Sequence, residues 1–114
     1  MRTGLLATAL VAGNVFAAAA QDQMKLFKVV SPKDEVVVGL SVDELRGFGP
    51  AADLDNFAQH LATAGEMSVW QYAVRKDQSG NLQQAPLRRI AVFKNDTMRI
   101  EPYTTPLPVV APTM

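Results

Sequence analysis

Cysteine is absent from this chain, and histidine occurs only once, as His60. Without cysteine the chain cannot be cross-linked by a disulfide, and thiol catalysis and cysteine-based zinc sites are excluded. His60 is the only side chain that titrates near neutrality without perturbation. Neither a nucleophile nor an orienting group can be assigned to it from the spacing of the residues. We therefore interpret His60 as a structural residue and expect no catalytic residues.

An excess of charge of one sign is also absent, because 11 Lys and Arg residues balance 11 Asp and Glu residues. A chain of zero net charge has no bulk attraction to nucleic acid or to an acidic surface, and we expect no nucleic-acid partner. Basic residues nonetheless gather in the second half of the chain. If the last three strands pair in order, Lys76, Arg75, Arg88, Arg89 and Arg99 form a positive patch suited to an anionic protein or envelope polymer.

A hydrophobic run long enough for a membrane helix is missing as well, since a span needs about 20 predominantly apolar residues. The uncharged, largely apolar segment from Gly4 to Phe16 is shorter, follows Arg2 and leads into four alanines at 17–20. This is the layout of a cleavable secretory signal peptide. We predict a signal peptide over residues 1–20, with cleavage after Ala20. The expected product is periplasmic or secreted from a bacterium and has no stable membrane anchor.

Metal and phosphate motifs are lacking too. Asp53 and Asp55 superficially resemble the start of a calcium loop, but apolar residues follow where further oxygen ligands are needed. Acidic residues in a first helical turn are explained by the positive end of the helix dipole. The segment Gly47–Ala51 has too few glycines for a phosphate cradle. We therefore expect neither a metal site nor a cofactor.

What is present is an alternation of short structural elements. Residues 24–30 and 35–40 are rich in apolar and β-branched residues. A short turn at Ser31–Asp34 separates them, which predicts an antiparallel hairpin. Ser41 and Glu44 then have the spacing of a capping box, which predicts a short helical turn.

The main helix is predicted to follow the break at 47–50. We expect the first helical turn to end at about Arg46, and Asp53 to cap the next helix. Gly65 is placed to end that helix in the left-handed conformation. Four apolar residues recur at helical spacing and predict one buried face: Leu54, Phe57, Ala58 and Leu61.

After the helix the period of the sequence changes to two. In residues 67–76 alternate side chains predict a strand with one buried face, formed by Trp70, Tyr72 and Val74. Residues 87–94 are apolar on both faces, which predicts a central strand. A third strand is expected over 97–101.

The last segment is rich in proline and cannot be an interior strand. We expect residues 103–114 to form an extended tail that lies on the domain or engages a groove. The predicted fold class is α+β, with a single domain over 21–102. Its element order is β-β-α-β-β-β, in which an antiparallel meander of about four or five strands packs on one main helix.

These observations indicate a small exported bacterial protein without catalysis, acting as a periplasmic accessory or protein-binding module. The expected partner is another envelope or periplasmic protein, contacted through a sheet edge and the tail. The residues that we expect to make ligand or partner contacts are Trp70, Tyr72, Arg75, Arg88, Arg89 and Arg99.

Two other functions stay open. One is a small-ligand carrier with an apolar pocket lined by Phe57, Leu61, Trp70 and Tyr72. The other is a hydrolase that uses a carboxylate pair, although a domain of this size has little room for a cleft closed to water. Its candidate carboxylates are Asp34, Glu35, Asp43, Glu44, Asp53 and Asp55.

Overall fold

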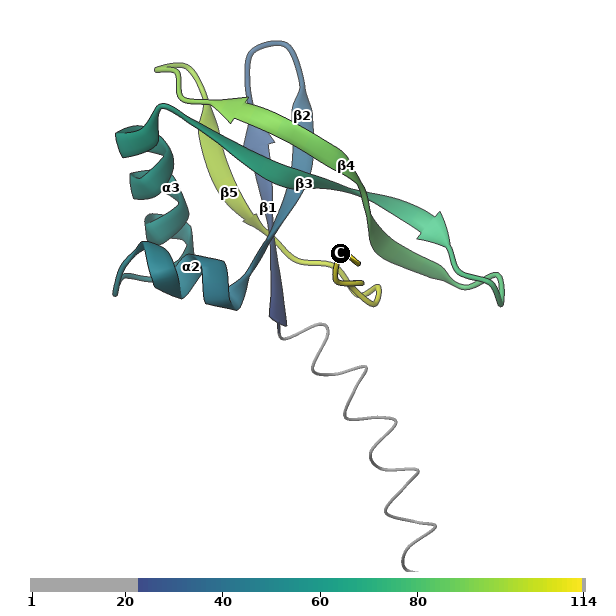
Figure 1. Ribbon diagram of the computed structural model, residues 1–114. Coiled ribbons are helices and arrows are strands. Elements are labelled where there is room, and N and C mark those ends of the chain that lie inside the picture. The colour runs from purple at the N-terminus through teal and green to yellow at the C-terminus, as the bar shows by residue number, and fades with distance from the viewer. Residues whose placement is uncertain (1–22, 114) are drawn as a thin grey trace, which may run out of the picture.

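The computed structural model describes residues 23–113. The predicted signal peptide and its cleavage site lie outside these residues. The described chain is an α+β protein with a five-stranded antiparallel sheet, as predicted (Figure 1). Its elements are β1 (Met24–Val30), β2 (Glu35–Ser41), α2 (Val42–Phe48), α3 (Asp53–Ala64), β3 (Glu66–Lys76), β4 (Leu82–Phe93) and β5 (Arg99–Tyr103).

The sheet has the strand order β4-β3-β2-β1-β5. The predicted β1/β2 hairpin is present, and β3 pairs with β4 in a second hairpin. The predicted meander is wrong at its last strand, because β5 pairs with β1 and not with β4. The sheet curls strongly, so the short segment 94–98 carries the chain from one edge strand to the other (Figure 1).

β4 begins at Leu82, five residues before the predicted start, and it is an edge strand rather than a central one. The face of β4 that carries Ala91 and Phe93 is apolar but not buried, since Phe93 is 61% exposed. Pro86 fits this strand because it lies at the edge. A bulge at Leu87 further interrupts the pairing with β3.

The two helices begin and end close to their predicted limits. The predicted capping box is present at α2: the Glu44 N–H donates to Ser41 Oγ at 3.0 Å, and the Ser41 N–H donates to Glu44 Oε1 at 2.9 Å. α2 continues two residues past the predicted end, to Phe48. Asp53 is not the cap of α3 but its first residue, where the helix dipole favours a carboxylate.

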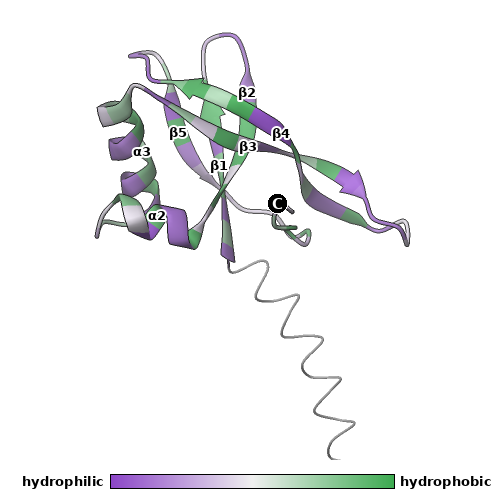
Figure 2. Ribbon diagram, viewed as in Figure 1, coloured by the Kyte–Doolittle hydropathy of each residue, from purple (hydrophilic) through white to green (hydrophobic). Residues whose placement is uncertain are grey.

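A first core fills the space between the sheet and the helices. Phe57 and Leu61 of α3 are fully buried there, as predicted, and the Phe57 ring packs against Phe27 with the ring centroids 5.1 Å apart. In Figure 2 the strands carry most of the apolar colour, whereas α2 and much of α3 carry polar colour. The buried members of this core are Phe27, Val29, Val38, Leu40, Leu45, Phe57, Leu61, Val69 and Val92.

A second, smaller core lies on the opposite face of the sheet, and the proline-rich tail covers it. Its buried members are Met24, Leu26, Tyr72 and Val109. The Gln84 N–H donates to the Pro108 carbonyl at 2.8 Å, and the Val110 N–H donates to the Gln84 carbonyl at 2.9 Å. Of the two arrangements expected for the tail, the structure has the one in which it lies on the domain.

The far half of the β3/β4 hairpin, residues 72–86, extends beyond the rest of the sheet as a two-stranded arm (Figure 1). β2 pairs with β3 only at Val38 and Gly39. No further strand therefore lies beside the arm to cover Val74, which is 52% exposed although its spacing predicted burial. Within residues 23–113, no helix is both long and apolar enough to cross a membrane.

Candidate functional site

The candidate site is a cleft of about 440 Å³ between the start of α2, the β3/β4 pair and the end of the tail. β2 runs directly into α2 because Ser41 ends the strand and caps the helix, and this places Asp43 and Glu44 at one wall. Trp70 and Arg89 form the other wall. The complete lining is Gln23, Met24, Ser41, Val42, Asp43, Glu44, Trp70, Arg89, Ala111 and Pro112.

Trp70 is half-buried, and Arg89 lies over its indole ring. The two residues are direct neighbours across β3 and β4, and the Arg89 guanidinium carbon lies 5.6 Å from the ring centroid. Arg89 Nη2 also donates a hydrogen bond to the Ser68 carbonyl at 3.1 Å. A cation over an indole face contributes about 0.5–1 kcal/mol at an exposed site. The pair therefore presents a preformed apolar and cationic surface to the cleft.

The cleft carries charges of both signs. Asp43 and Glu44 are exposed at the start of α2, facing the same cleft as the Arg89 guanidinium. Glu44 is held by its capping bond to Ser41. A ligand that places an apolar group on Trp70 and a cation beside the two carboxylates matches this arrangement.

Tyr72 is buried in the second core and anchors the tail rather than facing solvent. Its hydroxyl donates to the Val110 carbonyl at 2.6 Å, which fixes the segment leading into Ala111 and Pro112 of the cleft. Burial, together with a smaller effect of the negative charge of Glu44, raises the pKa of Tyr72 to about 12. The phenol therefore stays protonated in the folded protein under all ordinary conditions.

We expect the stability of the protein to depend on Tyr72 ionisation at high pH. The pKa of Tyr72 in the folded protein is raised above the ordinary tyrosine value of 10.0, so the unfolded chain loses this proton first. The contribution of protonated Tyr72 to the free energy of unfolding is complete below pH 10 and is lost progressively as the pH rises toward about 12. Urea unfolding across this window should show a steeper loss of stability for the wild type than for Tyr72→Phe. Parallel pH profiles for the two proteins would contradict this assignment.

The other arginines predicted as contacts do not join Arg89. Arg75 is exposed on the arm, and Arg88 Nε donates to Gln71 Oε1 at 3.2 Å on the other face of β4. Arg99 lies on β5, at the opposite edge of the sheet. The expected positive patch does not form, because it required β5 to pair beside β4.

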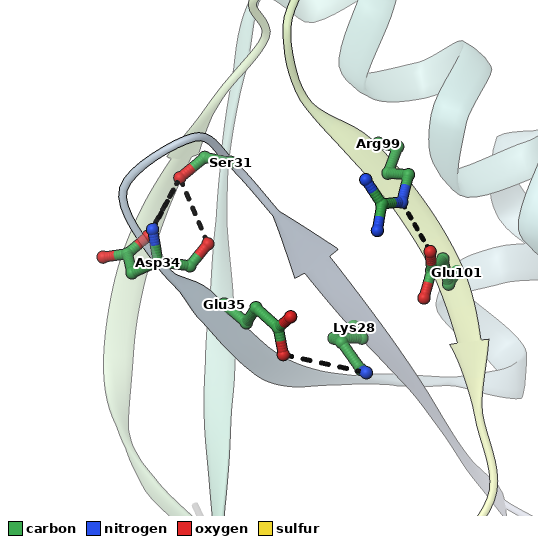
Figure 3. Close-up of polar contacts among 6 residues, drawn as sticks. All are labelled: Lys28, Ser31, Asp34, Glu35, Arg99 and Glu101. Atoms are coloured by element: carbon green, nitrogen blue, oxygen red, sulfur yellow. Dashed lines mark hydrogen bonds and ion pairs between the residues drawn. The ribbon is translucent and has the colours of Figure 1, made fainter.

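Arg99 belongs instead to a group of exposed polar contacts near the β1/β2 turn (Figure 3). Its Nε donates to Glu101 Oε2 at 2.6 Å, and this hydrogen bond holds the pKa of the Glu101 carboxyl below its usual value. Lys28 pairs with Glu35 at 3.7 Å on the same side of the sheet. Exposed pairs of this kind contribute little to stability.

The residues proposed for the ligand carrier are dispersed, whereas Asp43 and Glu44, two of the carboxylates considered for a hydrolase, line the cleft together. Phe57 and Leu61 lie in the first core while Trp70 and Tyr72 lie on the other face of the sheet, so the four cannot line one pocket. His60 stacks on Phe48, with ring centroids 3.9 Å apart and planes 8° apart. Across 23–113, no group of three or more His, Asp or Glu side chains is arranged to hold a metal ion.

Comparison with protein-family models, with curated proteins and with solved structures finds no match to this chain. Sequence reasoning selected Trp70 and Arg89 as contacts but missed their direct pairing and the opposing wall formed by Asp43 and Glu44. The capping box could have located that wall, since it fixes the point at which β2 turns into the helix.

Proposed function

We propose that this chain is a small exported bacterial protein that binds an extended segment of another envelope protein in the cleft beside Trp70, without catalysis. The observation that carries the proposal is the half-buried Trp70, with Arg89 over its ring and two carboxylates lining the same cleft. The volume of about 440 Å³ falls in the range of ligand sites, about 300–1,000 Å³. Export rests on the signal-like residues 1–20.

An extended polypeptide is the preferred occupant because the cleft already accommodates one along its rim. Ala111 and Pro112 of the tail line the cleft with Trp70, in an irregular segment that follows the strand-like pairing of Val109 with Gln84. Aromatic residues commonly provide the surface on which proline-rich and other extended segments dock. The carboxylates at the opposite wall favour a segment that carries Lys or Arg next to an apolar residue.

The test uses paired substitutions on β4 and α2. The full chain and its variants are expressed in a bacterium and crosslinked in place, and captured proteins are identified by mass spectrometry. Asp43→Asn and Arg89→Gln should each lower capture of one recurrent partner by about tenfold, equivalent to about 1.4 kcal/mol. Arg88→Gln is the matched control, because Arg88 lies next in sequence but outside the cleft.

Two results would refute the proposal in different ways. Equal capture by Arg89→Gln and Arg88→Gln would remove the cleft from the binding surface. Recovery of the protein in the cytosol with Met1 intact would overturn export, whatever the cleft binds. Deleting the tail is not a suitable test, since its removal uncovers the second core around Tyr72 and Val109.

A small-molecule ligand is the second candidate, favoured by the same cleft volume. Trp70 is the only tryptophan of the chain, so its fluorescence reports binding without a label. A fluorescence change produced by a low-molecular-weight envelope extract, and not by the captured protein, would favour the carrier over the protein-binding module.

A further inference from the structure

The outer edge of β4 from Arg89 to Phe93 is unpaired within residues 23–113. The Lys94 N–H donates to the Gly65 carbonyl at 2.9 Å, so the opposed residues Glu66 and Phe93 form a non-hydrogen-bonded pair. The N–H and C=O groups of Phe93 therefore point away from β3. By alternation along the strand, those of Ala91 and Arg89 point the same way.

The outer edge of β4 differs between the two halves of the strand. In the arm, the tail pairs with the edge at Gln84, Pro86 lacks an N–H, and Leu87 is bulged. These are the features by which proteins block the addition of a further strand. Residues 88–93 have no proline, bulge or covering segment, and they end in the exposed Phe93.

We propose that this edge pairs antiparallel with the same edge of a second copy of the chain, about a twofold axis at Ala91. In that register Ala91 faces its own counterpart, and Arg89 of each copy faces Phe93 of the other. All three residues have outward backbone groups, so the pairing satisfies both groups of each. An isologous contact requires a self-complementary surface of this kind.

The side chains on both faces support the register. Arg89 reaches over Trp70 within one chain, and the second copy places Phe93 on the outer side of Arg89, against the aliphatic stem of its side chain. On the opposite face Ile90 meets Val92. The cost is an exposed contact between Arg88 and Lys94, which screening by salt reduces.

A second copy explains this edge better than a foreign strand. Any foreign strand could pair with the free backbone groups of this edge. The side chains are more selective, because Arg89 and Phe93 lie two residues before and two residues after Ala91. A second copy that runs antiparallel places its Phe93 opposite Arg89 and its Arg89 opposite Phe93. The pairing shares Arg89 with the cleft, but its test changes only Leu87, Ala91 and Phe93, none of which lines the cleft. It would place two Trp70 clefts beside the twofold axis, and such a dimer binds a partner with two sites bivalently.

The absence of cysteine makes the test direct. Cα atoms of a hydrogen-bonded antiparallel pair lie about 5.5 Å apart, within the range of about 4.4–6.8 Å that a disulfide bridges. The full chain carrying Ala91→Cys, expressed and purified as the exported product, should form a disulfide dimer under mild oxidation. Leu87→Cys is the matched control: it is exposed on the same strand, and its two copies would be about 27 Å apart in this register.

The effects of salt and of Phe93 complete the experiment. Raising the ionic strength should accelerate crosslinking of Ala91→Cys, and adding Phe93→Ser to that variant should slow it about tenfold while circular dichroism shows an unchanged fold. Equal crosslinking at positions 87 and 91 would overturn the proposal, because it indicates random collision. Crosslinking of Ala91→Cys in cells to a different protein would also overturn it and assign the edge to a foreign strand.

Discussion

Replacing Asn56 with Asp is expected to lower the free energy of unfolding by about 3 kcal/mol or more, although the two side chains have nearly the same shape. Asn56 is only 3% exposed. Its amide nitrogen donates to the carbonyl oxygens of Leu45, Gly49 and Ala51 at 3.0, 2.9 and 3.0 Å. A carboxylate cannot donate, so the substitution leaves three carbonyls facing a buried negative charge.

The loss is large compared with the total stability of a small domain, about 5–15 kcal/mol. Urea unfolding followed by Trp70 fluorescence measures it. Asn95→Asp is the matched control: its exposed side chain acts as an acceptor, from the N–H and hydroxyl of Thr97. Asp keeps that acceptor, so this control should change stability by less than about 0.5 kcal/mol. An equally small effect at both positions would contradict the role given to Asn56.

Asn56 also connects the interior of the molecule to the cleft. Its side chain fixes the link between α2 and α3, because Asn56 Oδ1 accepts from the Ala51 N–H at 3.1 Å while the amide nitrogen holds the end of α2. α2 carries Asp43 and Glu44. We therefore expect an Asn56→Asp variant that still folds to show weaker partner capture than its remaining stability explains.

This residue illustrates what the sequence could not predict. Local signals were sufficient for the capping box, the β1/β2 hairpin and the end of α3 at Gly65, because each depends on residues a few positions apart. No local signal in the sequence distinguishes Asn56 from the other polar residues of α3. Its contacts depend on how the chain turns between two helices, which no period or spacing reveals.

The same limit explains the errors in the sheet. An apolar strand such as β4 has the same sequence pattern whether it is central or at an edge. β4 is an edge strand because β5 pairs with β1 and not with β4. For the candidate site, the alternation of residues along a strand drew attention to Trp70, and the placement of basic residues drew attention to Arg89. The opposing carboxylates and the tail residues Ala111 and Pro112 reach the cleft through long-range packing, which has no local signal.

The second large effect is expected at Gly39, in the middle of β2. A Cβ atom built on Gly39 would lie 2.3 Å from Cε1 and 2.7 Å from Cδ1 of Tyr72, far inside van der Waals contact. The ring cannot move aside freely, because it is buried and its hydroxyl is bound to the Val110 carbonyl. Gly39→Ala should therefore lower the free energy of unfolding by about 3 kcal/mol through overpacking.

Gly47→Ala is the matched control. Apart from its chain neighbours and the backbone of its own helix, no atom of the described residues lies within 4 Å of the Cβ position at Gly47. The residue is helical, so alanine should be neutral or stabilise by up to about 1 kcal/mol. The cause of the Gly39 effect is tested with Tyr72→Leu, which removes the ring. If the clash with the ring is responsible, Gly39→Ala should cost much less in the Tyr72→Leu background, with a coupling of about 1–3 kcal/mol.

The Gly39 contact also determines the shape of the cleft. The ring of Tyr72 lies against β2 only because Gly39 has no side chain, and from there its hydroxyl holds the tail at Val110. A displaced ring releases the segment that places Ala111 and Pro112 beside Trp70. Gly39→Ala should therefore change Trp70 fluorescence in the folded state, and Gly47→Ala should not. Two results together would contradict this role of Gly39. The changes in the free energy of unfolding caused by Gly39→Ala and Tyr72→Leu would be additive in the double variant, and Gly39→Ala alone would leave Trp70 fluorescence unchanged. Gly39 would then not be required for the position of Tyr72.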